Sequence, residues 1–244
     1  MRRELGAIVG TAERSAAPPP LRPRTAQELA RLVDHTLLRP DATWAEAEEA
    51  CRFAARHGCC AVCLSPRYVA QAARELAGTG VRVATVVAFP HGADAAAVKA
   101  FAAAQAAAQG ADEVDMVLAL GALRAHDDQA VLDELRFVRS ALPGRTLKVI
   151  LETGLLEEAE IVRAALLACA AGADFVKTST GFLGPGATPQ AVGLLHAAVG
   201  GACGIKASGG IRTAEDVRAL LAAGATRLGM SRTAEILATW EGGR

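Results

Sequence analysis

A short phrase, glycine followed by alanine and a polar residue, recurs where a helix-like segment of this chain gives way to a strand-like one. It occurs at Gly110-Ala111-Asp112, Gly172-Ala173-Asp174 and Gly224-Ala225-Thr226, and an apolar run follows each time. Glycine readily adopts the left-handed backbone conformation that ends an α-helix. The recurrence predicts a chain built from one repeated helix–strand unit, which restricts the fold to the α/β class.

Eight apolar segments have the length and alternation of β-strands, and alanine- and leucine-rich segments suited to helices separate them. The predicted strands are centred on residues 33–38, 60–64, 81–89, 113–118, 147–152, 174–178, 204–207 and 227–230. Threonines that can cap a first helical turn mark helix starts at Thr43, Thr188 and Thr213. Strands that alternate with helices pair in parallel through right-handed crossovers, and eight of them close into a (β/α)8 TIM barrel.

An open doubly wound sheet is the alternative to the barrel. The barrel is favoured because no Gly-x-Gly-x-x-Gly sequence follows the first predicted strand to mark a dinucleotide-binding fold. A chain of 244 residues, of which 52% are hydrophobic, can bury one large core, so a single domain is expected.

The N-terminal part of the chain lacks a sustained apolar period. Residues 1–24 contain Pro18-Pro19-Pro20 and scattered arginines, which predicts a flexible arm. Thr25 and Glu28 have the form of a capping box and predict a short helix to about Leu32. We therefore expect an arm over residues 1–24 and a barrel domain over residues 25–244.

Composition narrows the partners and the compartment. The 26 basic and 26 acidic residues give a formal net charge of zero without a basic run, so neither nucleic acid nor an anionic membrane is an expected partner. No stretch approaches the ~20 apolar residues of a membrane span, and no signal-peptide pattern follows Arg2-Arg3. A cytoplasmic protein with a small-molecule partner is predicted.

Cysteines and histidines do not form a metal-binding pattern in the sequence. The cysteines are Cys51, Cys59, Cys60, Cys63, Cys169 and Cys203, and no second pair accompanies the spacing of Cys60 and Cys63. Reduced, buried thiols are favoured over disulfides or a metal site, and neither a metal nor a cofactor is expected.

Polar and charged side chains collect on one face of the predicted strands, whereas the other face is almost wholly apolar. The polar face holds Asp34, Thr36, Cys63, Ser65, Glu113, Asp115, Lys148, Glu152, Lys177, Ser179, Lys206 and Ser208. In a closed barrel the apolar face meets the helices, so these residues point toward the axis. Single members have structural explanations: Lys148 can neutralise Asp115 or Glu113, and Glu152 can hold a loop. The set as a whole favours a functional site.

Lysine is scarce in this chain, which makes its positions informative. Only Lys99, Lys148, Lys177 and Lys206 are lysines, and arginine supplies the other strong bases. Arginine serves as well in ion pairs but cannot deprotonate to attack a carbonyl. Because Lys177 and Lys206 lie on consecutive predicted strands, the charge of one and partial burial both disfavour protonation of the other.

A neutral amine at this position would be a Schiff-base nucleophile. Its condensation with a carbonyl gives an iminium ion, which stabilises the enamine formed when a neighbouring C–C bond breaks. A carboxylate, Asp115 or Asp34, would transfer protons during the loss of water and the protonation of the enamine. Amine, second cation and carboxylate are the minimum set for a metal-free aldolase.

Glycines at the ends of late strands predict a phosphate site. Gly209 and Gly210 follow the seventh strand and precede a helix, so backbone N–H groups and a helix N-terminus face the barrel mouth. Gly181 follows the sixth strand and Ser231 follows the eighth. Alone, Gly209-Gly210 would be a plain turn, but barrels often bind phosphate in the loops after strands seven and eight.

From about Leu32 to Leu237 the chain resembles the deoxyribose-phosphate aldolase family. The segments that carry the resemblance are residues 34–38, 61–67, 84–92, 111–116, 147–154, 174–182, 205–212 and 227–231. The resemblance implies a (β/α)8 class I aldolase, a lyase of deoxyribonucleotide catabolism. Such an enzyme reversibly cleaves 2-deoxy-D-ribose 5-phosphate to D-glyceraldehyde 3-phosphate and acetaldehyde. It also implies a homodimer.

The resemblance further implies a role for each matching residue. Lys177 matches the Schiff-base lysine, Lys206 the lysine that lowers its pKa, and Asp115 the proton-relay acid. The implied supporting residues are Asp34, Thr36, Lys148 and Cys63, and the implied phosphate contacts are Gly181, Gly209, Gly210 and Ser231.

Two departures from the family pattern bear on the chemistry. Some members have a lysine where Phe182 stands and a C-terminal tyrosine that assists proton transfer, whereas this chain ends in Trp240-Glu241-Gly242-Gly243-Arg244. Phosphate affinity and enamine protonation are therefore expected to differ, with water or Asp115 covering the second role. A Schiff-base aldolase for another phosphorylated sugar, and a non-catalytic barrel that senses a sugar phosphate, are the alternatives.

Overall fold

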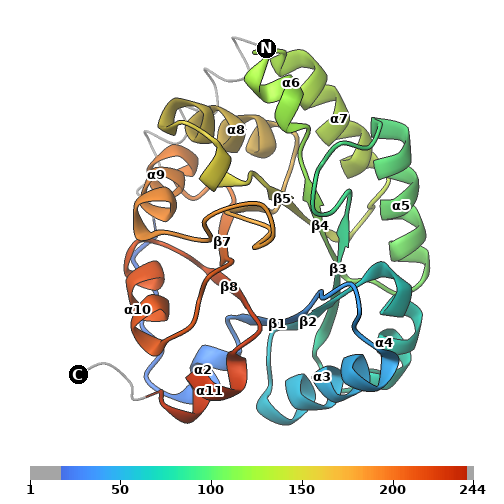
Figure 1. Cartoon of the computed structure of the whole chain (residues 1–244), viewed down its shortest axis with the longest axis vertical. Coiled ribbons are helices and arrows are strands. Elements are labelled where there is room, and N and C mark those ends of the chain that lie inside the picture. Colours follow the sequence, from blue (N-terminus) through green and yellow to red (C-terminus); the bar gives the residue numbers. More distant parts are fainter. Residues whose placement is uncertain (1–17, 241–244) are drawn as a thin grey trace.

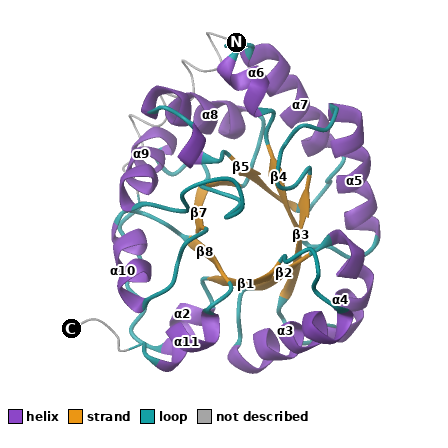
Figure 2. Ribbon diagram, in the orientation of Figure 1, coloured by secondary structure: helices purple, strands orange, loops and turns teal. Residues whose placement is uncertain are grey.

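Eight parallel strands form a closed barrel inside a ring of helices in the computed structural model, which describes residues 18–240 (Figure 1, Figure 2). The strands are β1 (Val33–Leu37), β2 (Ala61–Leu64), β3 (Arg82–Val87), β4 (Glu113–Val117), β5 (Thr146–Ile150), β6 (Phe175–Lys177), β7 (Gly204–Ser208) and β8 (Arg227–Met230). Each strand pairs with the next, and β8 pairs with β1. The predicted (β/α)8 barrel is confirmed, with strand ends that differ from the prediction by one or two residues.

Helices cover the outside of the barrel. They are α2 (Ala26–Ala30), α3 (Trp44–His57), α4 (Val69–Glu75), α5 (Ala96–Ala108), α6 (Leu120–Arg124), α7 (Asp128–Ser140), α8 (Glu158–Ala170), α9 (Pro189–Val199), α10 (Ala214–Ala222) and α11 (Thr233–Ala238), with 3-10 turns η1 (Pro66–Tyr68) and η2 (Thr153–Leu155). The predicted N-caps are confirmed, because the side chains of Thr25, Thr43, Thr188 and Thr213 each accept a backbone N–H of the first turn. The helix that Thr25 opens ends at Ala30 rather than Leu32.

The recurring glycines stop helices as predicted. Gly110, Gly172 and Gly224 have φ angles of 105°, 81° and 111°, in the left-handed region that favours glycine. At Gly224 a Cβ would also lie 2.5 Å from the ring of His196. Glycine is therefore required there both for the backbone turn and for the packing of α9 against α10.

The two faces of the strands have different surroundings. The large apolar core lies between strands and helices and includes Val62, Val114, Val149 and Val176. A second, small apolar cluster of Ala61, Cys63, Ala84 and Val86 lines the inner face of β2 and β3. The remaining inner face carries buried charge, so the barrel interior is apolar on one side and ionic on the other.

The predicted N-terminal arm lies partly outside the described residues. Within the described part, residues 18–24 contain no helix or strand, and the Arg24 backbone N–H donates to Glu28. The division into an arm over 1–24 and a barrel domain over 25–244 stays a prediction. Among residues 18–240, none of the helices combines the length and the apolar character needed to cross a bilayer.

Candidate active site

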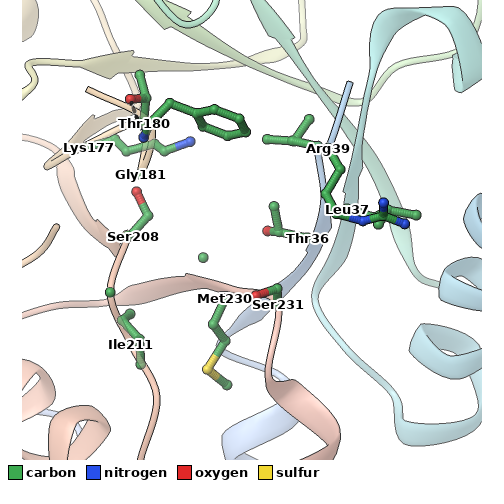
Figure 3. Close-up of a pocket in the computed structure, with 15 residues that line it drawn as sticks. Thr36, Leu37, Arg39, Lys177, Thr180, Gly181, Ser208, Ile211, Met230 and Ser231 are labelled. Carbon is green, nitrogen blue, oxygen red and sulfur yellow. Dashed lines mark hydrogen bonds between the residues drawn. The ribbon is translucent and has the colours of Figure 1, made fainter. Parts of the chain in front are cut away.

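A pocket of about 300 Å³ opens at the carboxyl ends of the strands. It is lined by the ends of β1, β6, β7 and β8 and by the loops that follow them (Figure 3). The residues that line it include Thr36, Arg39, Lys177, Gly181, Phe182, Ser208, Gly209, Gly210, Met230 and Ser231. The carboxyl end of the strands is the face that carries the active site in barrel enzymes.

Lys177 is the amine that reaches this pocket. It is the last residue of β6, and its side chain points into the pocket (Figure 3). All four lysines of the chain are buried, and Lys177 at 3% exposure is the one that retains contact with the pocket, since the other three are 0% exposed. A small carbonyl compound can therefore meet one lysine only.

Lys206 lies beside Lys177 on the neighbouring strand. The register of β6 and β7 pairs the two residues directly. Both Nζ atoms donate to the same oxygen, Asp115 Oδ2, at 2.8 Å from Lys177 and 2.7 Å from Lys206. Lys206 also donates to Asp34. The three residues predicted as catalytic thus meet at one carboxylate oxygen.

A second layer of ion pairs lies below this carboxylate. Lys148, paired with Asp115 by strand register, donates to Asp115 Oδ1 at 2.7 Å and lies 2.5 Å from Glu113 Oε2. Arg227 donates to Asp34 Oδ1 at 2.7 Å and to Glu113 Oε2 at 3.1 Å. Asp34 and Asp115 therefore each bind different cations at their two oxygens, whereas Glu113 Oε2 lies between Lys148 and Arg227.

The buried part of the connected network contains one more cation than anions, and the half-exposed Arg82 adds a further pair to Glu113 Oε1 at 3.1 Å. Its buried members are the carboxylates of Asp34, Glu113 and Asp115 and the cations of Lys148, Lys177, Lys206 and Arg227. Burial of an uncompensated charge is expensive, and a buried group with a proton to lose avoids that cost by losing it. Arginine cannot do so in proteins, which leaves the lysines.

Among the three lysines of the network, Lys177 is the one whose pKa is lowered. Burial lowers the pKa of Lys177, and Lys206 lowers it again, against an upward contribution from Asp115. Burial also disfavours the charge on Lys206 and Lys148, but the carboxylates around them, Asp115 foremost, raise the pKa of both above the ordinary value. Lys206 therefore stays a cation beside an amine that is easier to deprotonate.

The carboxylates remain ionised. Burial alone would raise the pKa of Asp115, but Lys148, Lys177 and Lys206 hold it well below its usual range. The pKa of Asp34 is lowered in the same way by Lys206, Lys148 and Arg227, against the effect of burial. Because their pKa values are lowered, Asp34 and Asp115 are expected to take up a proton only from a strong acid close by, such as a protonated reaction intermediate.

Two of the predicted supporting residues lie next to the network. Thr36 lines the pocket and donates to the backbone oxygen of Asp34 at 2.9 Å. Cys63 is fully buried on the inner face of β2, and burial raises its pKa to about 11, so it is a neutral thiol at physiological pH. All the predicted catalytic and supporting residues are thus brought together in or beneath one pocket.

The predicted phosphate residues also line the pocket, where they form a rim after β6, β7 and β8 that is called the glycine rim. Gly181, Gly209, Gly210 and Ser231 all line it, and α10 begins shortly after Gly210. At Gly209, where φ is 84°, a Cβ would come within 3.1 Å of the Cα atoms of Gly181 and Gly186. The loops after β6 and β7 therefore pack backbone against backbone, which leaves N–H groups available at the rim.

Sequence reasoning missed several residues of the site. Arg227 completes the lower layer, and as the single charge of the four-residue strand β8 it had no pattern in the sequence to mark it. Arg39 brings a cation to the pocket rim, where its guanidinium is paired with Asp41 and Glu46.

Glu152, which was predicted among the inward-facing residues, lies outside the ion network, and its carboxylate accepts the Thr180 backbone N–H at 3.1 Å. Glu152 therefore holds the loop after β6, which agrees with the structural explanation given for it from the sequence.

Comparison with known proteins agrees with this geometry. The family model described as DeoC/LacD family aldolase matches residues 29–234. The chain belongs to this aldolase family. Membership makes it a lyase, and the buried lysines, the carboxylates and the glycine rim all lie within the matched DeoC/LacD region.

Two similar proteins are named deoxyribose-phosphate aldolase. A deoxyribose-phosphate aldolase of Mycobacterium avium is 51% identical over 218 residues, which cover 87% of this chain and 97% of the relative. One from Clostridium perfringens is 47% identical over 211 residues, covering 86% and 94%. The solved structure of the deoxyribose phosphate aldolase from Aeropyrum pernix, described as a tetramer, is 30% identical with a TM-score of 0.82 and covers 95% of this chain and 96% of its own.

Proposed function

We propose that the protein is a class I deoxyribose-phosphate aldolase, which reversibly cleaves 2-deoxy-D-ribose 5-phosphate to D-glyceraldehyde 3-phosphate and acetaldehyde. The names of its relatives support the substrate. The observation that carries the chemistry is that Lys177, the one lysine open to the pocket, shares a carboxylate oxygen with the cation Lys206. An amine in this position is a nucleophile poised for Schiff-base formation.

In the first half of the proposed reaction, the Lys177 amine attacks the C1 aldehyde of the open-chain sugar. The carbinolamine loses water to give an iminium ion, and Asp115, 2.8 Å from the Lys177 nitrogen, is placed to relay the protons of this step. Lys206 stays protonated beside the reacting nitrogen and so favours its neutral form before attack.

In the second half, the C2–C3 bond breaks. Its electron pair enters the iminium to form an enamine on Lys177, and the C3 hydroxyl loses its proton as D-glyceraldehyde 3-phosphate departs. Protonation of the enamine at C2 and hydrolysis then release acetaldehyde and restore the amine. We assign proton return to Asp115 or to a water molecule held by Thr36, which lines the pocket.

The phosphate is proposed to bind at the glycine rim. The backbone N–H groups of Gly181, Gly209 and Gly210 and the Ser231 hydroxyl are the donors for it, near the positive end of the α10 dipole. Phe182 is half exposed and packs edge-on against Phe89, with ring centroids 5.2 Å apart, so this position contributes an apolar wall. Arg39 is the arginine of the pocket lining.

Assembly and compartment are parts of the same proposal. We expect a homo-oligomer, a homodimer in the simplest case, and a cytoplasmic location. Gel filtration with light scattering measures the first, and fractionation of cells measures the second.

The decisive experiment measures the natural protein with 2-deoxy-D-ribose 5-phosphate and detects D-glyceraldehyde 3-phosphate through a coupled assay. A parallel sample receives acetaldehyde and borohydride, and peptide mapping should find a two-carbon addition on Lys177. A label on another residue, or none, contradicts the assigned nucleophile. Turnover of a different phosphorylated sugar in a substrate panel would keep the Schiff base and change the substrate. Phosphate binding without turnover of any sugar would favour the sensing barrel.

A further inference from the structure

The end of the barrel opposite the pocket contains two cysteines that face each other. Cys169 lies in the last turn of α8, and Cys203 immediately precedes β7. Their sulfur atoms are 2.6 Å apart, although 34 positions separate the residues in the sequence. An S–S bond is ~2.05 Å long, so little movement would join them.

Backbone hydrogen bonds hold both cysteines in place. The Gly172 N–H donates to the Cys169 carbonyl at 3.0 Å, closing the end of α8. On the other side, Ala202 N–H donates to Val199 at 2.8 Å and Gly204 N–H to Asp174 at 2.8 Å, so hydrogen-bonded turns flank Cys203. The two sulfurs therefore face each other because of the fold of the surrounding backbone.

Accessibility distinguishes this pair from most other thiols of the chain. Cys169 and Cys203 are partly exposed, whereas Cys51, Cys59 and Cys63 are buried. Cys60 is also partly exposed. A small oxidant can thus reach Cys169 and Cys203 without unfolding of the barrel.

We propose that Cys169 and Cys203 form a dithiol site that peroxides or small-molecule disulfides convert to an intrachain disulfide. Two S–H bonds break and one S–S bond forms, and the two protons and two electrons reduce hydrogen peroxide to two molecules of water. With oxidised glutathione they reduce its disulfide to two thiols.

The bond would enclose the part of the chain that carries the candidate nucleophile. The loop between Cys169 and Cys203 contains β6, Lys177 and the Gly181 rim. A disulfide stabilises chiefly by restricting the unfolded chain, and more so for a longer loop. Because the pair lies at the amino ends of β6 and β7, away from the pocket, oxidation should leave the site geometry intact.

Protonation sets the rate of the reaction. The contact with Cys169 and burial both raise the pKa of Cys203, so Cys203 is a neutral thiol at neutral pH. The thiolate is the reactive form, and oxidation should therefore accelerate as the pH rises.

The test uses the natural protein, treated with hydrogen peroxide or oxidised glutathione and then alkylated and digested. We expect a linked peptide that contains Cys169 and Cys203, with Cys60 as the exposure-matched control that stays available for alkylation. The oxidised protein should melt roughly 5–10 °C higher than the reduced protein and return to the lower value with a reductant. Its retro-aldol rate should stay within about twofold.

Three results would overturn the proposal. One is recovery of Cys169 and Cys203 as separately alkylated or separately oxidised peptides. Another is linkage of either residue to Cys60. The third is a linked peptide without a rise in melting temperature. In the variant Cys203→Ser the oxidant should produce no rise, and the comparison of reduced with oxidised natural protein stands even if that variant fails to fold.

Discussion

Two buried lysine–carboxylate sites in this molecule differ in charge balance. Outside the barrel, Lys99 on α5 donates to Glu134 on α7 at 2.8 Å and to the Val117 carbonyl at 3.0 Å. Glu134 also accepts the Ala119 N–H at 3.1 Å. This site has one cation and one carboxylate, and its remaining hydrogen bonds go to the backbone at the end of β4. The charges of this site are balanced, and the two side chains link α5, α7 and the end of β4.

Inside the barrel, four cations share three carboxylates, and Lys177 reaches a pocket that Lys99 does not. The comparison of charge balance shows that burial and a salt bridge do not by themselves make a lysine reactive. A balanced pair is stable with both charges present, whereas a surplus cation in a buried cluster favours loss of one proton. The network's reactivity follows from its excess of one positive charge.

The largest effect on activity is expected for Lys177→Met. The retro-aldol rate should fall on the order of 10⁴-fold or more, because no other lysine is open to the pocket. Since the surplus cation is removed, the melting temperature should be equal to or above that of the natural protein. Lys177→Arg is the matched control, which keeps the charge and should be equally inactive without the gain in stability. A marked loss of stability in Lys177→Met would contradict the charge count.

Asp115→Asn should reduce the rate by roughly 10²- to 10⁴-fold, because the group proposed to relay protons is lost. The variant also removes a negative charge, so the pKa of Lys177 should fall further. Because the neutral amine is the active form, the acidic limb of the rate profile should move to lower pH. Measurement of kcat/KM across the pH range tests this direction.

Arg227→Met should move the acidic limb in the opposite direction. Without this cation the buried members of the network carry three charges of each sign, with only the half-exposed Arg82 in addition, so protonated Lys177 is better compensated and its pKa rises. The acidic limb of kcat/KM should therefore move to higher pH, and the rate at neutral pH should fall roughly tenfold for each pH unit that the limb moves. Arg227→Lys keeps the cation and should restore the natural profile. An unchanged pH profile in Arg227→Met would contradict the claim that a surplus buried cation lowers the pKa of Lys177, whatever the effect of the variant on stability.

Lys99→Met should have the smallest effect on turnover and a large effect on stability. Loss of the lysine leaves Glu134 buried without its cation, which costs about 3–5 kcal/mol. Urea unfolding measures this loss, and the double variant Lys99→Met with Glu134→Gln should regain part of it. The rate per folded molecule should stay within about twofold. A change in the pH profile of this variant comparable to that of Arg227→Met would mean that the two sites are not distinct.

The fold could be predicted from the sequence because its signals are local. The glycine phrases end helices through backbone geometry, as the φ of 105° at Gly110 and 81° at Gly172 illustrate, and the threonine caps act within one turn. Alternation along a strand depends only on that strand, so the inward positions of Asp115, Lys148 and Lys177 were also predictable.

The parts that could not be predicted depend on contacts between distant segments. That Lys177 and Lys206 meet at one oxygen of Asp115 requires the register of β6 with β7 and the closure of the barrel that brings β4 within reach of both. Arg227 stands alone as a charge in a four-residue strand, which gives too short a pattern to read. The spacing of Cys169 and Cys203 in the sequence does not indicate that their side chains meet.

The absence of lysine from the protein's exterior has a practical consequence. The four lysines lie within residues 18–240 and all are buried, while the exposed strong bases are arginines, whose guanidinium stays protonated. Dissolved aldehydes add to neutral primary amines, so prolonged incubation with them meets no exposed lysine side chain to modify. Reagents that immobilise enzymes through surface ε-amino groups should, for the same reason, attach it poorly, and chemistry directed at carboxylates would serve better.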